Sequence, residues 1–222
     1  MTVRENPGAE CPEGFPDCHW LGEVERLRSE IAELLELVHT DSLTGLCNHR
    51  RFSEALEHEL ERTRRTGYPL AMLMMDLDFF KKVNDTWGHE AGNQTLRHVA
   101  ELLKDSVRRI DLPCRYGGEE FAILLPSTPL AKAVQVAERI RDCIENSPIE
   151  LEETTLKVTA SIGVGVYHSR TSETAEHFIE RVDSFLYKAK ADGRNQVAHP
   201  PFESDRAVSE VSQDEKNLLL GG

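Results

Sequence analysis

The chain has 222 residues, of which 39% are hydrophobic, and its formal net charge at pH 7 is −13. This length accommodates one globular domain of about 160 residues with extensions at its ends. The negative charge argues against a nucleic-acid polymer as ligand, because proteins that bind duplexes or strands present basic surfaces. A small anionic nucleotide needs only a local group of cations, so this composition does not exclude it.

The cysteine content and the hydropathy indicate a compartment. The five cysteines are an odd number, and no secretory hydrophobic region precedes them, which favours a reducing, cytoplasmic setting. No stretch approaches the roughly 18 apolar residues that span a bilayer, so we expect a soluble protein. Cys11, Cys18 and His19 are possible metal ligands, but their spacing is unusual for zinc and we favour no site there.

Residues 1–19 are polar and contain proline and glycine, so we expect a flexible lead. A helix is predicted over residues 20–40, where apolar side chains recur in steps of four and three. This is the spacing of a coiled-coil seam, and its members are Trp20, Val24, Leu27, Ile31, Leu34 and Val38. The seam favours a dimerising stalk. Packing of the helix on its own domain is the alternative, and Leu35 beside the seam suits both.

The remaining elements follow from apolar periodicity. Helices are expected over residues 48–66, over a short segment ending at 84, and over 91–107, 129–146 and 173–191, with Gly88-His89 as a break. Strands are expected over residues 70–77, in a hairpin at 115–125, over 156–166 and at the sheet edge at 196–197. On helix 129–146 we expect Ala131, Val134, Ala137 and Ile140 to face inward. The mixed order predicts an α+β domain over residues 41–199, followed by a disordered acidic tail over 200–222.

Two acidic segments lie at positions that favour a binding or catalytic site over a purely structural role. In Gly117-Gly118-Glu119-Glu120-Phe121, two glycines at a hairpin tip let a ligand approach the backbone, and two carboxylates follow. Asp76 ends an apolar strand, where an unpaired carboxylate is costly and a cation must compensate it. Together these segments have the layout of a two-metal site for nucleotidyl transfer, although the hairpin alone is equally typical of a polar loop. For Asp78 we favour a structural role, as a cap for the following helix.

These segments resemble the GGDEF-domain diguanylate cyclases, with GGEEF as a variant of the signature. The resemblance runs from Asp41 to about Val197. It also rests on the ordered motifs Asp41–Arg50, Asp76–Asn93 and Lys188–Asn195. It implies a polymerase-palm-like fold, in which a mostly antiparallel central sheet is wrapped by helices, preceded here by the stalk helix.

The resemblance implies a reaction that joins two GTP molecules into cyclic di-GMP and releases two pyrophosphates. The catalytic residues would be Asp76, Glu119 and Glu120, and Glu119 would also help to remove the hydroxyl proton. Two divalent ions, Mg²⁺ or Mn²⁺, would be held by these three side chains and the Leu77 carbonyl. The implied GTP contacts are Phe79, Phe80, Lys81, Asn84, Asn93, Gly117, Gly118, Lys190 and Arg194. For Lys190 and Arg194, a solvated helix C-terminus is the alternative interpretation.

One position departs from the family pattern. The family usually has Asp where this chain has Asn93. The residue at this position is expected to bind guanine together with Asn84. An Asn oxygen still accepts a hydrogen bond, but its amide donates and brings no charge, so we expect guanine binding to persist. This departure favours a competing interpretation, a non-catalytic receptor for GTP or cyclic di-GMP that signals through its stalk. The three acids Asp76, Glu119 and Glu120 favour the enzyme.

A regulatory site is also implied. Arg108-x-x-Asp111 before the signature, with Arg139 on the next helix, resembles the family's product-inhibition site, and a surface ion pair is the alternative. Because one domain binds one GTP, catalysis needs two domains face to face, and we expect the stalk to form a homodimer. No sensor domain is recognisable before Asp41, so we hypothesise that a separate cytoplasmic protein acts on the stalk.

Overall fold

The computed structural model describes residues 19–151 and 155–202. The helices are α1 (His19–His39), α2 (His49–Thr66), α3 (Phe80–Ser106), α4 (Leu130–Asn146) and α5 (Ala175–Ala191). The strands are β1 (Leu70–Leu77), β2 (Leu112–Arg115), β3 (Glu120–Pro126), β4 (Ile149–Glu150), β5 (Thr155–Leu156), β6 (Ala160–Tyr167) and β7 (Val197–Ala198). The predicted lead up to residue 18 and the predicted tail from residue 203 lie outside the described residues.

The central sheet has the strand order β2-β3-β1-β6-β7. Strand β1 lies in its middle and pairs antiparallel with both β3 and β6, while β7 pairs parallel with β6. Strands β4 and β5 form a separate two-stranded ribbon. The predicted α+β fold with a mostly antiparallel sheet is therefore confirmed.

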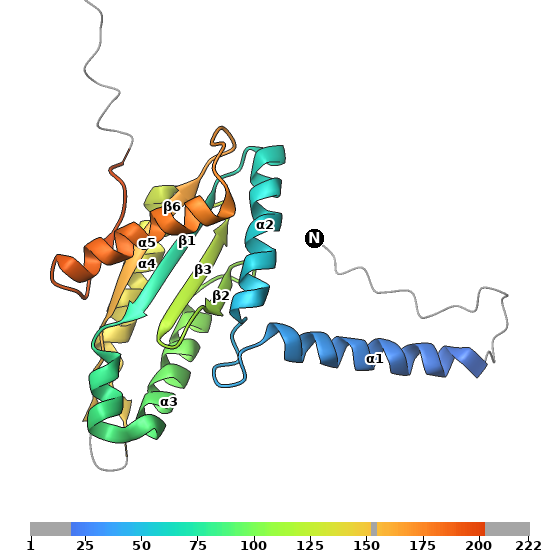
Figure 1. Cartoon of the computed structure of the whole chain (residues 1–222), viewed down its shortest axis with the longest axis horizontal. Helices are drawn as coiled ribbons and strands as arrows, with labels where there is room; N and C mark the ends of the chain where they lie inside the picture. The colour runs from blue at the N-terminus through green and yellow to red at the C-terminus, as the bar shows by residue number, and fades with distance from the viewer. Residues whose placement is uncertain (1–18, 152–154, 203–222) are drawn as a thin grey trace, which may run out of the picture.

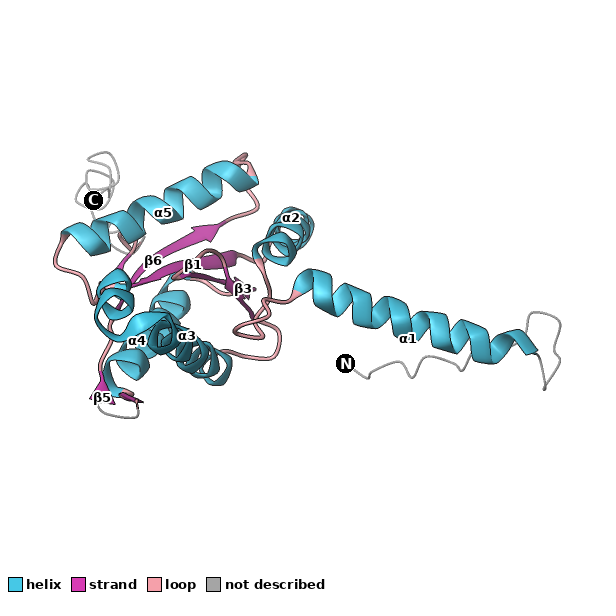
Figure 2. Cartoon of the chain, turned by 60° about the horizontal axis from the view of Figure 1, so that its bottom comes forward, coloured by secondary structure: helices cyan, strands magenta, loops and turns pink. Residues whose placement is uncertain are grey.

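Helices cover both faces of this sheet (Figures 1 and 2). Odd-numbered side chains of β1, from Ala71 to Leu77, share a core with α3 and α4. Even-numbered ones, from Leu70 to Met74, share a second core with α2 and α5. Because side chains alternate along a strand, Asp76 belongs to the face that α5 covers. This alternation decides which helix can bring a cation to Asp76.

Most predicted element bounds agree with the structure to within one or two residues. Strand β1 covers the predicted residues 70–77, and Asn48 caps α2 by accepting a hydrogen bond from the Arg51 N–H group. The predicted break is a kink inside α3, where Gly88 has φ 82° and ψ 166°. Residues on either side of this kink are therefore not on one continuous helical face.

Two local predictions are wrong. The strand expected over 156–166 begins only at Ala160, because Leu156 pairs in the β4–β5 ribbon. On α4, Ala131 is exposed at the start of the helix, and the buried stripe consists of Ala133, Ala137, Ile140 and Ile144. That stripe recurs at steps of three and four, so the helical period was predicted correctly and its first member was misplaced.

The predicted stalk is a helix, α1, and it extends away from the sheet domain in both views (Figures 1 and 2). Four of its seam side chains, Val24, Leu27, Ile31 and Val38, are 37% to 55% exposed, so they do not pack on the chain's own domain. The side chains of Trp20, Leu34 and Leu35 lie outside the described residues. Within the described ranges, no helix is long and apolar enough to cross a membrane.

Candidate active site

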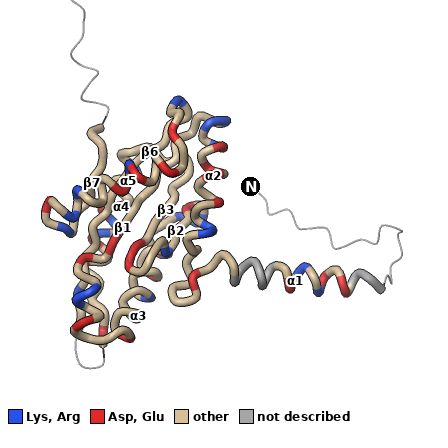
Figure 3. The backbone as a smooth tube through the Cα atoms, in the orientation of Figure 1, with Lys and Arg blue, Asp and Glu red and all other residues tan. Residues whose placement is uncertain are grey.

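The sheet brings the two acidic segments together where β1 ends and β3 begins, a place that we call the acidic edge of the sheet. Asp76 on β1 is paired with Glu120 on β3, and the Leu77 N–H group donates to the Glu119 carbonyl at 3.3 Å. Acidic stretches accordingly lie side by side at the ends of β1 and β3 (Figure 3). Sheet register therefore joins groups that are more than forty residues apart in the sequence.

Asp76 is buried, at 7% exposure, and it has a cationic partner. Its Oδ2 atom lies 2.8 Å from Nζ of Lys190, in the last turn of α5. Burial raises the pKa of the Asp76 carboxyl, and the hydrogen bond from Lys190 opposes this effect. Burial also raises the pKa of Glu119, and the Asp76 carboxylate adds to that rise. The fold thus brings the carboxylates of Asp76 and Glu119 close together, and a bound cation would stabilise their charged forms.

The donor atoms at this edge fit a hard divalent ion. Carboxylate oxygens of Asp76 and Glu119 and the neighbouring Leu77 carbonyl are ligand types that Mg²⁺ and Mn²⁺ prefer. The ion pair with Lys190 shows that the Asp76 carboxylate is accessible to a cation in this position. The described residues hold no cluster of three or more acidic, histidine or cysteine side chains that would form a ready cage. Magnesium usually takes one or two carboxylates and completes its shell with water and phosphate oxygens, so the arrangement suits a metal bound together with a nucleotide.

The signature turn is shaped by its first glycine. The Tyr116 and Gly117 N–H groups both donate to the Glu120 carbonyl, at 2.8 and 3.1 Å, and close the hairpin. A Cβ atom at Gly117 would lie 2.5 Å from Oε2 of Glu120, so any larger residue would displace this carboxylate. No such crowding surrounds Gly118. The glycine at 117 therefore makes room for a neighbouring acid, and nucleotide contact by either glycine stays a prediction.

The start of α3 lies beside the closing motif. Phe79 is the N-cap residue in a left-handed conformation, φ 58°, and no side chain caps the helix. Uncapped N–H groups and the helix dipole favour an anion there. The guanidinium of Arg194 lies 4.6 Å from the centre of the exposed Phe79 ring. The predicted phosphate contacts Phe79, Phe80 and Arg194 are therefore close together, and Lys81 is exposed in the same turn.

The prediction that Asp78 caps α3 is wrong. Phe79 is the N-cap residue, and its left-handed backbone separates Asp78 from the helix. Asp78 is instead buried and accepts hydrogen bonds from the hydroxyl groups of Thr159 and Ser161, each at 2.7 Å. It also accepts one from the Asn195 N–H group at 3.0 Å. Its partners come from β6, the segment before it and the closing motif, none of which is adjacent in sequence.

The two predicted guanine-reading residues lie on opposite sides of the kink in α3. The Asn84 side chain packs against Gly92, the residue before Asn93, where a Cβ atom would collide with it. Both asparagines are half-buried. Hydrogen bonds from Arg97 and Asn93 lower the pKa of Glu90. An aspartate at position 93 would repel this carboxylate, whereas the asparagine amide donates a hydrogen bond to it, so the local environment favours asparagine.

The three residues of the predicted inhibitory site also meet, at the C-terminal end of α3. Asp111 Oδ2 accepts a hydrogen bond from the backbone N–H group of Arg108 at 2.8 Å, and Oδ1 is buried without a partner in the part of the chain that is described. Burial raises the pKa of Asp111, and the charges of Arg108 and Arg139 oppose this rise. Arg139 donates to the Ser106 carbonyl at 2.5 Å. Among the described ion pairs there is none between the Arg108 and Asp111 side chains, so the surface-pair alternative is not what the structure shows.

Sequence reasoning missed an ion pair that supports the signature. Asp41 Oδ2 lies 3.2 Å from Nη1 of Arg115, and Asp41 also accepts hydrogen bonds from the Thr44 hydroxyl and N–H groups. Arg115 then donates through Nη2 to the Gly118 carbonyl at 2.8 Å. This arginine connects the start of the domain to the hairpin tip. The signal in the sequence was an arginine two residues before Gly117 together with the Asp-x-x-Thr turn.

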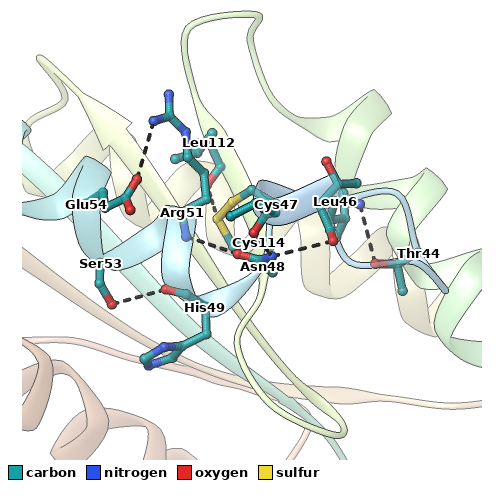
Figure 4. Close-up of a disulfide and its surroundings, with 12 residues drawn as sticks. Thr44, Leu46, Cys47, Asn48, His49, Arg51, Ser53, Glu54, Leu112 and Cys114 are labelled. Carbon is teal, nitrogen blue, oxygen red and sulfur yellow. Dashed lines mark hydrogen bonds and ion pairs between the residues drawn. A yellow bond between two sulfur atoms is a disulfide. The ribbon is translucent and has the colours of Figure 1, made fainter. Parts of the chain in front are cut away.

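A disulfide joins the same two regions (Figure 4). Cys47 and Cys114 have Cα atoms 4.4 Å apart, although 67 residues separate them in sequence. Cys47 forms an isolated β-bridge with Thr40, just after α1, and Cys114 lies on β2. This pair was not predicted from the sequence, where the odd number of cysteines favoured a reducing compartment. Of the described cysteines, Cys143 is free, and Cys11 and Cys18 lie outside the described residues.

Comparison with known proteins identifies the family. Residues 38–196 match the family model described as "Diguanylate cyclase, GGDEF domain". The chain belongs to this family. The resemblance inferred from the motifs is thereby confirmed, and diguanylate cyclases with GGDEF domains generally use a divalent metal ion.

Two curated relatives illustrate the match. The response regulator PleD of Caulobacter vibrioides is 46% identical over 176 residues, which cover 78% of this chain and 38% of PleD. Diguanylate cyclase A of Treponema denticola is 41% identical over 169 residues, covering 75% of this chain and 45% of that protein. The chain thus spans less than half the length of these relatives.

Two solved structures have the same fold. The coiled coil and GGDEF domain of DgcB from Caulobacter crescentus, in complex with c-di-GMP, superposes with a TM-score of 0.76 at 30% identity, covering 81% of this chain and 94% of that one. The diguanylate cyclase SiaD of Pseudomonas aeruginosa, in complex with its activator SiaC, gives 0.73 at 39% identity, covering 81% of this chain and 68% of that one.

Proposed function

We propose that this chain is a diguanylate cyclase that condenses two GTP molecules into cyclic di-GMP and releases two pyrophosphates. The observation that carries the proposal is the acidic edge of the sheet. There, buried Asp76 lies opposite Glu120, next to Glu119 and 2.8 Å from Lys190. Membership of the GGDEF family supports the same conclusion.

Each chemical step is attack of a ribose 3′-hydroxyl on an α-phosphate, with pyrophosphate as the leaving group. Two Mg²⁺ or Mn²⁺ ions, when bound, would activate the hydroxyl and neutralise the phosphates. Asp76, Glu119, Glu120 and the Leu77 carbonyl would hold them. Lys190 forms an ion pair with Asp76, and with Lys81 and Arg194 it would bind the triphosphate. Glu119, whose pKa is raised by burial, would also help to accept the hydroxyl proton.

Asn84 and Asn93 would read the guanine. Their oxygens would accept hydrogen bonds from the N–H groups of guanine, and the contact of Asn84 with Gly92, the residue before Asn93, supports a shared base. Asn93 also favours the second candidate function, a receptor that binds GTP or cyclic di-GMP without turnover. The complete set of acids argues for the enzyme.

Regulation would act through two further surfaces. Cyclic di-GMP would inhibit by binding Arg108, Asp111 and Arg139, because arginines at this cluster suit its phosphates and bases. The exposed seam of α1 would form a homodimer that brings two GTP-loaded domains face to face. A separate regulatory protein would bind the stalk, as the complex of SiaD with an activator illustrates for a relative.

We place the protein in the cytoplasm, without a nucleic acid or a membrane as partner. Disulfides are rare in that compartment. The oxidation state of Cys47 and Cys114 in cells is therefore an independent check on this part of the proposal.

The decisive experiment is incubation of the purified chain with GTP and Mg²⁺, followed by chromatography of the products. The proposal expects cyclic di-GMP and pyrophosphate in a ratio of one to two, and no product after chelation of the metal. Tight binding of GTP or cyclic di-GMP without any product would identify the receptor instead. Arg28→Glu, a variant of an exposed residue on α1, controls for preparation effects.

A further inference from the structure

Asp78 is a buried carboxylate that the proposed reaction does not use. It lies two residues after Asp76, is 5% exposed, and is surrounded by hydrogen-bond donors that carry no charge. Ser161 donates to Oδ1, and Thr159 donates to Oδ2. Burial of a carboxylate is costly unless hydrogen bonds compensate it, and these two hydroxyl groups supply part of that compensation.

The third donor is the backbone of the closing motif. The Asn195 N–H group donates to Asp78 Oδ2 at 3.0 Å. Arg194 and Asn195 both have left-handed backbones, with φ of 64° and 45°. Left-handed conformations of residues other than glycine persist only where the surroundings over-determine them. The Asp78 carboxylate is one of the groups that do so here.

Phe79, which follows Asp78 in the chain, contacts the arginine of this turn. Phe79, also left-handed, has its ring 4.6 Å from the Arg194 guanidinium. Asp78 is therefore linked to Arg194 in two ways. It bonds the backbone of the turn that carries Arg194, and it precedes Phe79, whose ring contacts the Arg194 guanidinium. The side chain of Asn195 is tied separately to α4, by hydrogen bonds with Arg141 and Glu145, so the turn is held on two sides.

We infer that Asp78 is a positioning residue, which holds the Arg194 turn so that its guanidinium meets the triphosphate of the bound nucleotide. The inference rests on the proposed function, because that proposal assigns Arg194 to the phosphates. Asp78 has no role as a direct ligand in it, since its carboxylate is buried and its oxygens are occupied by donors. An asparagine keeps one acceptor oxygen but loses the negative charge, so it should weaken the hydrogen bonds that the carboxylate accepts, including the one from the Asn195 N–H group.

The test is a double-mutant cycle on nucleotide affinity. The probe is a GTP analogue with a methylene group between its α and β phosphorus atoms, which prevents turnover, titrated by calorimetry with Mg²⁺. Asp78→Asn and Arg194→Ala should each weaken binding by about tenfold. Because Asp78 acts through Arg194, the double variant should bind no more weakly than Arg194→Ala alone. Guanosine, which has no phosphates, should bind wild type and Asp78→Asn equally.

The matched control is Ser161→Ala. It removes a donor to the other oxygen of the same buried carboxylate and leaves the Asn195 bond, so it should lower the melting temperature without changing analogue affinity. If Asp78→Asn does not fold, Asp78→Ser replaces it, because the shorter side chain no longer reaches the Asn195 N–H group. It should weaken analogue binding about tenfold in the wild-type background and not at all in the Arg194→Ala background.

The outcomes separate the two claims. Losses that multiply in the double variant, or an equal loss of guanosine binding, would show that Asp78 acts independently of Arg194 and overturn the inference. If Arg194→Ala weakens the analogue and Asp78→Asn does not, the inference fails while the proposed function stands. If Arg194→Ala leaves analogue affinity unchanged, the assignment of this arginine to phosphates fails, and the inference fails with it.

Discussion

The acidic edge of the sheet and the helix α1 are built in opposite ways. At the edge, Asp76 is buried and already has a cationic partner, Lys190, within the same chain. On α1, apolar side chains such as Leu27 and Ile31 are exposed and are not covered by the described part of the chain. One region satisfies its chemistry within the described residues, and the other leaves an apolar surface exposed, which we propose that a second copy of the chain covers.

The two regions would have different tasks in the proposed reaction. The positions of the candidate catalytic acids depend on strand register, which a single folded domain fixes. Two nucleotides would have to meet, and α1 would promote this by raising the effective concentration of a second domain to roughly millimolar. Substitutions at the acidic edge should therefore lower activity at any protein concentration, and substitutions on α1 should lower it mainly in dilute solution.

The strongest disruption should come from the acidic edge. Asp76→Asn and Glu119→Gln each remove a carboxylate that would hold metal, without adding bulk, and should lower cyclic di-GMP synthesis by about a hundredfold or more. Because burial raises the pKa of both carboxyls, their neutral replacements should fold as well as wild type. Product chromatography and thermal melts measure the two effects. Near-normal activity of either variant would contradict the metal assignment.

The junction between the two regions should respond to reductant. The Cys47–Cys114 disulfide closes a long loop, so its reduction should cost about 2–4 kcal/mol of stability. Melting of wild type with and without dithiothreitol measures this difference, and Cys47→Ser should melt like the reduced protein under both conditions. Cys143→Ser, at the free cysteine, should retain the sensitivity of wild type to reductant. If reductant leaves the melting of wild type unchanged, the bond does not form in solution.

The stalk should matter most in dilute solution. Leu27→Glu combined with Ile31→Glu places two charges on the exposed seam and should reduce specific activity at nanomolar protein by about tenfold or more, with recovery at micromolar protein. Light scattering should show a shift from dimer to monomer. Arg28→Glu changes the net charge by the same amount beside the seam and should behave as wild type. Equal activity of the seam variant at every concentration would remove α1 from the mechanism.

Product inhibition should separate the regulatory cluster from the acidic edge. Arg108→Ala removes a cation next to Asp111 and should raise the cyclic di-GMP concentration for half-inhibition by about fivefold, with initial rates unchanged. Rates measured over a product titration give this value. An inhibition curve identical to that of wild type would place the inhibitory site elsewhere.

The smallest expected effect is at position 93. Asn93→Asp restores the family's acid and should keep or improve GTP use, by less than about threefold. The gain is limited because the new carboxylate faces Glu90, from which it would take a hydrogen-bond donor. Combining it with Glu90→Gln should relieve that repulsion. Steady-state kinetics over a GTP titration measure both variants, and a large loss in Asn93→Asp would give the asparagine a role of its own.

The family, the extent of β1 and the identity of the candidate acids were predictable from the sequence alone. Local signals suffice for these, because an apolar run, a glycine pair and ordered motifs are properties of neighbouring residues. The same signals gave the helical character of residues 20–40 and the break at Gly88. They placed Ala131 and the start of β6 wrongly, because burial and strand pairing at those points depend on which distant element packs there.

Only the tertiary structure decided the partners of the charged groups. It joined Asp76 to Lys190, Asp41 to Arg115, and Asp78 to the turn at Asn195, each across a long stretch of sequence. A carboxylate at a strand end is equally suited to cap a helix, to bind a metal or to hold a loop, and its sequence neighbours do not distinguish these roles. The physical reason is that hydrogen bonds and ion pairs act over a few ångströms in space, and the sheet register sets which groups come that close.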